Sequence, residues 1–238
     1  MEIKSLSHTS PDELFEAFEQ AFADYEVQLN KAEHLTMFKR RGFNPKASFG
    51  AFDRDKLVSF TCNGIGNFYG VRAAYDTGTG TLKDYQGRGL ATQVFEYSIP
   101  YLRELGIEEY LLEVLQHNTG ALSVYRKLGF EITREFYYFK QKNKQVDRAV
   151  KALDCCYTLK SIKISEYSSI HKFWDFEPSW QNSFEAINNT LKDFICLGVF
   201  LESKLVGYGV FEPVSGDVTQ IAVDKEHRRK GIGSLLFQ

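Results

Sequence analysis

This chain of 238 residues lacks several features that assign a protein to a class at once. No apolar run approaches the ~20 residues that a membrane-spanning helix needs, and the first residues do not follow the basic-then-apolar pattern of a signal peptide. Neither sign of charge dominates, with 29 Lys and Arg against 31 Asp and Glu. We therefore expect a cytoplasmic protein without a membrane partner or a broad nucleic-acid surface, although a small phosphate pocket fits this charge.

Cysteine is also scarce. The four cysteines contain no CxxC pair and have no histidine at a zinc-ligand spacing, which disfavours a disulfide framework and a structural metal. We expect no metal. What is present is a globular composition, 43% hydrophobic and 25% charged, in a chain long enough for one or two domains.

The chain repeats itself imperfectly. The sequence GAF at 50–52, followed by KLV at 56–58, recurs as GVF at 198–200 followed by KLV at 204–206. Further along, QGRGLA at 86–91 recurs as RRKGIG at 228–233, at nearly the same displacement. Two ordered matches of this kind indicate two related domains in tandem.

The first half has a clear predicted order of elements. Ser10 and Asn30 each have the position of a helix N-cap, and the first lies in a capping box with Pro11 at the first helical position. The expected elements, in order, are a strand over 3–6, two helices, a hairpin over 48–52 and 56–63, a strand over 72–81, a helix from Leu90, a strand over 110–115, a helix after Asn118 and an aromatic-rich strand over 130–140.

A polar, charged stretch over 141–154 is the expected linker, so the predicted domains are 1–140 and 155–238. The second half restarts with a predicted strand over 161–165, a helical region over 169–190, a hairpin and a strand over 218–223. We expect it to be incomplete after its glycine turn. A sheet that ends there has an unpaired edge, so either the sequence is truncated or another surface covers the edge, and a second copy in a homodimer is one such surface.

The two glycine turns are candidate phosphate sites. A strand that runs into Gly-x-small at a helix start directs several backbone N–H groups to one point, and the helix dipole adds positive charge there. The alternative is a tight turn without a ligand. Neither GxxxxGK[ST] nor a dinucleotide fingerprint fits, because Thr92 stands where the latter needs Gly or Ala. The predicted cofactor-binding residues are Gln86, Gly87, Arg88, Gly89, Leu90 and Ala91, and in the second half Arg228, Arg229, Lys230, Gly231, Ile232 and Gly233.

These residues resemble a known family. Q/R-x-x-G-x-G/A at a strand–helix junction is similar to the acetyl-CoA signature of the GNAT N-acetyltransferase superfamily, and N-x-x-A-x-x-x-Y-x-x-x-G-F at 118–130 resembles its second motif. The resemblance covers about 3–140 and, up to the first motif only, 155–238. It implies an α/β (mixed α+β) fold of two tandem GNAT-like domains. Each would have a central mixed, mostly antiparallel twisted sheet flanked by helices.

The resemblance also implies a function. It implies an acetyltransferase that moves the acetyl group of acetyl-CoA directly to a primary amine of an unidentified acceptor, a small molecule or a protein amine, in a ternary complex. Tyr125 matches the family's general acid, and Asn118 its arm-positioning amide or only a helix cap. Asp76 and Glu113 are the candidates for the base, with a surface carboxylate as the alternative for each. A non-catalytic CoA-binding regulatory module and a structural dimerisation protein remain the competing hypotheses.

Overall fold

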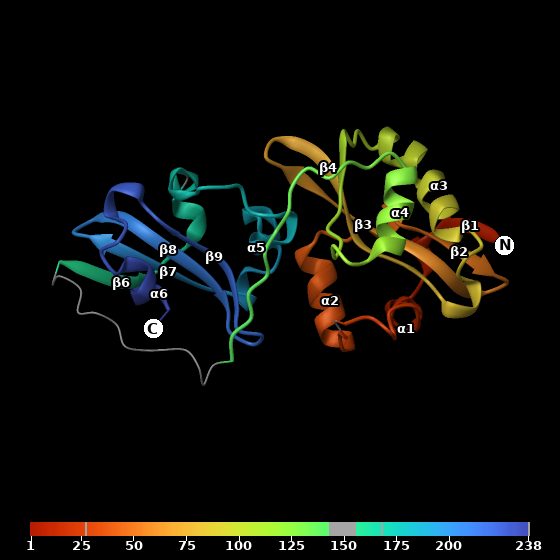
Figure 1. Cartoon of the computed structure of the whole chain (residues 1–238), viewed down its shortest axis with the longest axis horizontal. Helices are drawn as coiled ribbons and strands as arrows, with labels where there is room; N and C mark the ends of the chain where they lie inside the picture. Colours follow the sequence, from red (N-terminus) through yellow and green to blue (C-terminus); the bar gives the residue numbers. More distant parts are fainter. Residues whose placement is uncertain (27, 143–155, 168, 238) are drawn as a thin grey trace. The chain divides into compact units, whose positions relative to one another are not determined.

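The structure is a computed structural model that describes residues 1–26, 28–142, 156–167 and 169–237 (Figure 1). The chain divides into two compact units, Met1–Arg134 with Ser183–Asn189, and Glu135–Asn182 with Thr190–Gln238. Most of the expected linker, residues 143–154, and the final residue lie outside the described residues. Within the described part, no helix has both the length and the apolar character needed to cross a bilayer.

The first unit has a five-stranded mixed sheet in the order β1-β2-β3-β4-β5. The first four strands pair antiparallel and β5 joins β4 in parallel, so the predicted mixed, mostly antiparallel sheet is confirmed. The strands are β1 (Glu2–Ser5), β2 (Phe49–Asp53), β3 (Lys56–Phe68), β4 (Val71–Thr81) and β5 (Glu109–Leu111).

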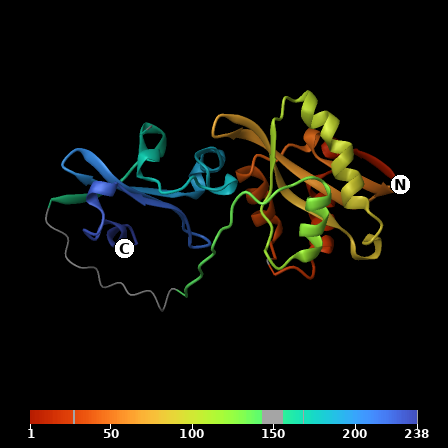
Figure 2. The same cartoon turned by 45° about the horizontal axis from the view of Figure 1, so that its top comes forward.

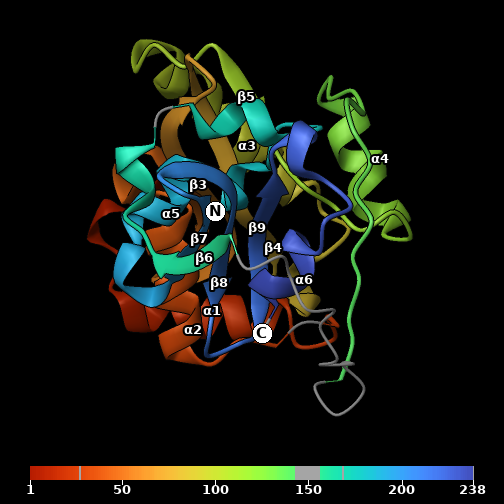
Figure 3. The same ribbon diagram turned by 90° about the vertical axis from the view of Figure 1, so that its left-hand side faces the viewer.

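Four helices flank this sheet: α1 (Pro11–Ala21), α2 (Lys31–Arg40), α3 (Leu90–Glu104) and α4 (Thr119–Lys127). The predicted capping box at Ser10 and the predicted N-cap at Asn30 are both present, because each side chain accepts a hydrogen bond from the N–H group three residues on. Asn30 also forms a capping box, with Glu33. The helices α1 and α2 lie on one side of the sheet and α3 on the other (Figures 1 and 3).

Strand alternation explains how both faces of this sheet are covered. Phe60 of β3 points to α1, where the ring of Phe18 lies 5.8 Å from its own ring. Thr61, the next residue, points to the opposite face together with its cross-strand partner Phe49. The ring of Phe49 packs 4.9 Å from Tyr101 of α3. The strand register therefore fixes which residues face α1 and which face α3. The same register decides on which face the polar side chains of β4 lie.

The second unit repeats the strand order in a four-stranded antiparallel sheet. The strands are β6 (Tyr157–Ser161), β7 (Ile195–Leu201), β8 (Lys204–Glu212) and β9 (Asp217–Val223), and a short helix α6 (Ile232–Leu236) follows the glycine turn. The helix α5 (Phe184–Asn189) is grouped with the first unit.

The repeat extends to irregularities of the sheets. The β2–β3 register shifts between Ala51 and Phe52, and the β7–β8 register shifts between the corresponding residues Val199 and Phe200. A second bulge in β4 has its counterpart in β9. Bulges are specific features of a fold, so the matching positions support the interpretation of a duplicated unit.

Two strand predictions are wrong. Residues 130–140 form no strand, and Figure 2 draws them as a green coil after α4. An aromatic-rich segment needs a neighbouring ladder to become a strand, and in the described part of the chain none pairs with it, so Tyr137, Tyr138 and Phe139 are at least 85% exposed. The strand expected over 161–165 lies at Tyr157–Ser161 instead, because Ile164 begins a 3-10 turn that buries its side chain.

His34 is buried among aromatic rings between α1 and α2. Its ring lies 4.0 Å from Phe38 and 4.4 Å from Phe18, and neither ring nitrogen has a hydrogen-bond partner among the described residues. Burial lowers the pKa of His34 to about 4, because the imidazolium form has no acceptor there.

This burial predicts an acid-sensitive fold. The unfolded chain binds a proton at His34 below about pH 6.5 and the folded chain only near pH 4, so this group removes stability as the pH falls between these values, by about 3 kcal/mol in all. Denaturant unfolding of His34→Leu across this range should show a shallower loss than wild type. His8→Leu, at an exposed position, is the control. Parallel profiles for wild type and His34→Leu would contradict the assignment.

Candidate active site

The strands β4 and β5 separate in the middle of β4. Their parallel pairing joins Ala73 to Glu109 and ends with Tyr75 opposite Leu111. The remainder of β4 continues to Thr81 without β5 beside it. On that side, the backbone N–H and C=O groups of β4 have no ladder partner among the described strands. This β4–β5 separation, the part of β4 from Asp76 to Thr81, gives an edge to which an extended ligand can bind.

A β-bulge sets the direction of the Asp76 side chain. Cys62 pairs with Gly78, but the next residue of β3, Asn63, pairs with Asp76, so Thr77 is the extra residue. Gly78 faces α1, since a Cβ built there meets the ring of Phe18. Strict alternation would turn Asp76 to the same side. The bulge instead places Asp76 on the α3 face.

On the α3 face the carboxylate of Asp76 accepts three hydrogen bonds. The N–H of Gly78 donates to Oδ1 at 2.9 Å, and the hydroxyls of Thr79 and Tyr125 each donate to Oδ2 at 2.8 Å. Asp76 is 9% exposed. The structure thus joins two residues selected independently from the sequence, Asp76 and Tyr125, and adds Thr79, whose role as a donor to Asp76 the sequence does not indicate.

Tyr125 reaches Asp76 from α4, and aromatic packing fixes the end of that helix. The ring of Phe130, just beyond the helix, lies 5.6 Å from Tyr125 and 5.5 Å from Tyr110 of β5. Phe95 of α3 lies 5.4 Å from Phe130 and 4.9 Å from Tyr110. The G-F end of the second motif therefore contributes the ring that positions the phenol.

Burial and charge shift the protonation of this pair. Burial raises the pKa of Asp76, and the hydrogen bonds from Thr79, Tyr125 and Gly78 act against that rise. Burial, followed by the charge of Asp76, holds the pKa of the Tyr125 phenol well above its usual range. Tyr125 is therefore a neutral phenol at physiological pH, with a proton available for donation.

The other two predicted catalytic residues lie in different surroundings. Asn118 is the N-cap of α4, and its Oδ1 accepts the N–H of Ala121 at 3.1 Å. Glu113 follows β5, is exposed, and accepts a hydrogen bond from the Tyr75 hydroxyl. Tyr75 is buried under Arg41, whose guanidinium lies 5.8 Å from the Tyr75 ring. Arg41 was not selected from the sequence, because only the fold brings the end of α2 beside β4.

The first glycine turn has the backbone that an anion site requires. Gly87 and Gly89 have φ of +74° and +72°, and Gly89 is the N-cap of α3. Gln86 ties the turn to the end of β4 by donating to the carbonyl of Thr81 at 3.2 Å, and Arg88 donates to the carbonyl of Asp84 at 2.8 Å. Because the first N–H groups of a helix have no intrahelical acceptor, those of Leu90 and Ala91 point out of the turn with the positive end of the dipole.

The second glycine turn copies this backbone with different side-chain contacts. Arg229 and Gly231 have φ of +64° and +86°, at the positions of Gly87 and Gly89. The guanidinium of Arg228 is used within the protein, since it donates to the carbonyls of Val223 and Phe173 and to Asp175. Gly231 precedes a helix of only five residues. The remaining predicted residues, Lys230, Ile232 and Gly233, lie in the same turn.

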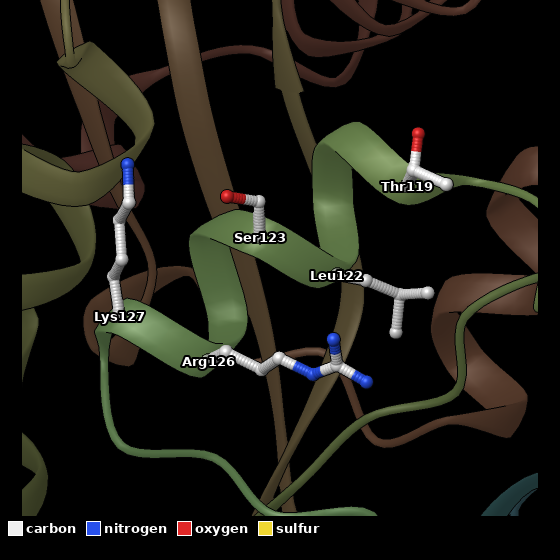
Figure 4. A pocket seen from close by; sticks show the side chains of 5 residues that line it. All are labelled: Thr119, Leu122, Ser123, Arg126 and Lys127. Atoms are coloured by element: carbon white, nitrogen blue, oxygen red, sulfur yellow. The ribbon is translucent and has the colours of Figure 1, made fainter.

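The outer surface of α4 has a hollow of about 370 Å³ (Figure 4). It is lined by side chains at helical spacing, with two hydroxyls and two cations among them: Thr119, Leu122, Ser123, Arg126 and Lys127. Hydroxyls and cations are the groups that bind phosphate, so this surface suits a phosphorylated ligand.

The second unit has a group of side chains that could bind a metal ion, but a lysine already neutralises its carboxylates. Asp224, Glu226 and His227 bring ligand atoms within 4.8 Å of one another. The ammonium group of Lys204 lies 3.3 Å from the Asp224 carboxylate and 3.9 Å from that of Glu226. We therefore assign no metal to these three side chains.

Comparisons with known proteins agree with the repeat and with the motifs. The acetyltransferase (GNAT) family model matches residues 12–130 and 156–238. Over 116 residues the chain is 32% identical to the N-alpha-acetyltransferase MAK3 of Arabidopsis thaliana, covering 48% of this chain and 61% of the relative. Over 91 residues it is 34% identical to the probable N-acetyltransferase san of Drosophila melanogaster, covering 37% and 50%. The chain thus spans less than two thirds of the length of these relatives.

Solved structures of low sequence identity also align with part of the chain. The NatC complex bound to Gag peptide and CoA aligns with a TM-score of 0.48 at 19% identity, covering 56% of this chain and 87% of that one. An aminoglycoside acetyltransferase from a soil metagenome, in complex with sisomicin, aligns with a TM-score of 0.48 at 19% identity, covering 59% and 96%.

Proposed function

This chain belongs to the acetyltransferase (GNAT) family, and we propose that it is an acyltransferase that moves the acetyl group of acetyl-CoA directly to a primary amine. One observation carries the proposal. The hydroxyl of Tyr125 meets the carboxylate of Asp76 at 2.8 Å, beside the point where β4 and β5 separate. A neutral phenol at that point is placed to protonate a leaving thiolate.

We propose that acetyl-CoA binds along three elements of the first unit. The pyrophosphate would bind the N–H groups of residues 86–91, and the extended arm would pair with β4 along the β4–β5 separation. The hydroxyls and cations of α4 would receive another phosphorylated part of the molecule. We propose no metal in this reaction, because the amine itself is the nucleophile and the phenol the acid.

The proton balance assigns a role to each side chain. The amine nitrogen attacks the thioester carbon, and its extra proton passes to a base. We propose Glu113 for this base, since it is exposed next to the strands that separate. As the C–S bond breaks, the electron pair leaves with sulfur, the Tyr125 O–H bond breaks and an S–H bond forms. The proton held by the base then returns to the phenolate through water. We propose that Asn118, as the helix cap, keeps α4 and its phenol in place.

The names of the relatives suggest an acceptor class. N-alpha-acetyltransferases are among them, so we propose the α-amine of a peptide or protein as the first acceptor to examine. The test incubates the whole chain with acetyl-CoA and a panel of peptides, and detects free CoA thiol and acetylated product together. A panel that includes an N-terminally blocked copy of each peptide separates α-amine from lysine acetylation. Absence of any acetyl-CoA-dependent product over all amines, small amines included, would contradict the function.

We further propose that residues 1–140 form the catalytic domain, 155–238 a second domain that does not catalyse, and 141–154 the link between them. The second bulge supports this, because register equivalence puts Val218 of β9 where β4 has Asp76. Asp217 corresponds to Tyr75 and accepts a hydrogen bond from Thr219 at 3.0 Å. The second unit thus has the backbone of the site without its carboxylate. We propose homodimer formation as its role, with CoA binding at its glycine turn as the alternative that Gly231→Glu tests.

A further inference from the structure

The buried carboxylate of Asp76 is the starting point, because the fold does not require it. The bulge that orients Asp76 in β4 recurs in β9, where Val218 occupies the equivalent position and the strand forms equally well. A buried carboxylate costs folding free energy unless hydrogen bonds compensate for its lost hydration. Its presence in the first unit therefore needs a reason other than strand geometry.

The carboxylate of Asp76 accepts its hydrogen bonds from groups of the protein itself. Gly78 and Thr79 donate from the same strand and hold the carboxylate in one orientation, and Tyr125 donates from α4 to Oδ2. These three donors take three of the roughly four acceptor sites of the carboxylate, and with Asp76 only 9% exposed an incoming amine has at most one lone pair of Oδ1 left to reach. This arrangement suits a group that holds a neighbour in place and does not suit a base that exchanges protons with a substrate.

We propose that Asp76 is a positioning residue for Tyr125: anchored by Gly78 and Thr79, it directs the phenol and keeps it protonated until the thiolate forms. This inference rests on the proposed acetyl transfer. It assigns Asp76 a different role from that of a general base, and it adds Thr79 as a second positioning residue. Both act on the reaction through Tyr125.

The charges around the pair are consistent with this role. Arg41, at the end of α2, is the permanently charged neighbour, and its positive charge favours ionised Asp76. The phenols of Tyr110 and Tyr25 and the thiol of Cys62 are neutral at physiological pH, since burial raises their pKa values. The buried phenol of Tyr75, the residue before Asp76, is neutral for the same reason. When Asp76 is ionised, its carboxylate places a negative charge beside the phenol, and ionisation of Tyr125 would then create a second one next to it.

The first test needs no substrate. Phenolate absorbance is titrated with pH in wild type and in Asp76→Asn, and in each case the corresponding Tyr125→Phe protein is subtracted to isolate Tyr125. Without the carboxylate, the phenolate of Tyr125 should form at a pH lower by on the order of one unit or more. An unchanged titration would overturn the proposal. Because the protein alone is measured, this result stands even where no acceptor is acetylated.

The second test is a double-mutant cycle with a peptide that wild type acetylates. Asp76→Asn should lower kcat by about ten- to a hundredfold with little change in the KM for acetyl-CoA, but should cost nothing further in a Tyr125→Phe background. Multiplying effects would show that Asp76 acts independently of the phenol, as a base does, and would overturn the proposal. The matched comparison is Glu113→Gln, whose effect should multiply with that of Tyr125→Phe.

If Asp76→Asn does not fold, Thr79→Val tests the same proposal. This variant removes one hydrogen bond to the carboxylate and keeps its charge, so kcat should fall while the titration of Tyr125 does not move to lower pH. In the Tyr125→Phe background Thr79→Val should again add nothing. A cost that persists there would overturn the proposal, whereas a wild-type protein without any acetyl transfer would contradict only the proposed function.

Discussion

Replacing Tyr125 by phenylalanine should lower kcat for acetyl transfer by about 10²- to 10⁴-fold, with little change in the affinity for acetyl-CoA. The phenol is the acid that protonates the leaving sulfur, and phenylalanine keeps the ring packing against Phe130 while removing the proton. Since burial raises the pKa of Tyr125, wild type should show no loss of this acid below about pH 10. Steady-state kinetics and acetyl-CoA titration measure the two effects separately.

Tyr137→Phe is the matched control, because its hydroxyl is also lost but its side chain is 85% exposed on the segment after α4. It should leave kcat and acetyl-CoA binding unchanged. An unchanged kcat in Tyr125→Phe would make this tyrosine a packing residue and would contradict the mechanism. A wild-type protein that binds acetyl-CoA without turnover, and a Tyr125→Phe protein that binds it equally well, would support the regulatory module instead.

Local chemistry predicted most of the first unit. The predicted caps at Ser10 and Asn30 specify two helix starts through hydrogen bonds within four residues, and the structure confirms both. The strand expected over 130–140 failed for the opposite reason. A strand exists only when another backbone supplies its hydrogen bonds, and β5, the sheet edge, is only three residues long. No property of the segment itself shows that its partner is missing.

The sequence predicts the individual residues of the site but not the hydrogen bond between them. The sequence indicates Tyr125 through a motif and Asp76 through its place on a strand, with nothing that links the two. Their contact depends on the bulge at Thr77, which reverses the side of the sheet that Asp76 faces. An alternating pattern would have put the carboxylate on the α1 face, away from α4. The bulge arises where β4 pairs with β3, so the sequence of β4 alone does not show which residue is the extra one.

The two units differ in the side chains on matching backbones. The turn with Gly87 and Gly89 has its counterpart in the turn with Arg229 and Gly231, and both enter a helix through a left-handed residue. The hydrogen bond that ties each turn to the end of the preceding strand also recurs: Arg228 donates to the carbonyl of Val223, as Gln86 does to that of Thr81. Arg228 additionally binds Asp175, which gives it a structural task. A repeated backbone is therefore not sufficient to assign a repeated ligand.

The glycine turn of the first unit makes the strongest binding prediction: Gly89→Glu should abolish the stabilisation that acetyl-CoA gives to the wild-type protein. A ligand at a hundred times its Kd stabilises the folded state by about 2.7 kcal/mol, which a thermal shift detects easily. Glutamate at this N-cap places a carboxylate at the positive helix end where the phosphates would bind, so the two anions compete. Gly231→Glu, in the second turn, should keep the full shift.

Gly89→Ala separates charge from backbone strain. Any side chain at φ of +72° is strained by about 1 kcal/mol, but the nearest atom to a Cβ at Gly89 is Nε2 of Gln93, 3.6 Å away, so alanine fits. Gly89→Ala should thus lose some stability and keep most of the acetyl-CoA shift, while Gly89→Glu loses it. Loss of the shift in Gly231→Glu alone would move the cofactor to the second unit, where β9 has Val218 in place of the carboxylate, and the Tyr125 mechanism would then fail.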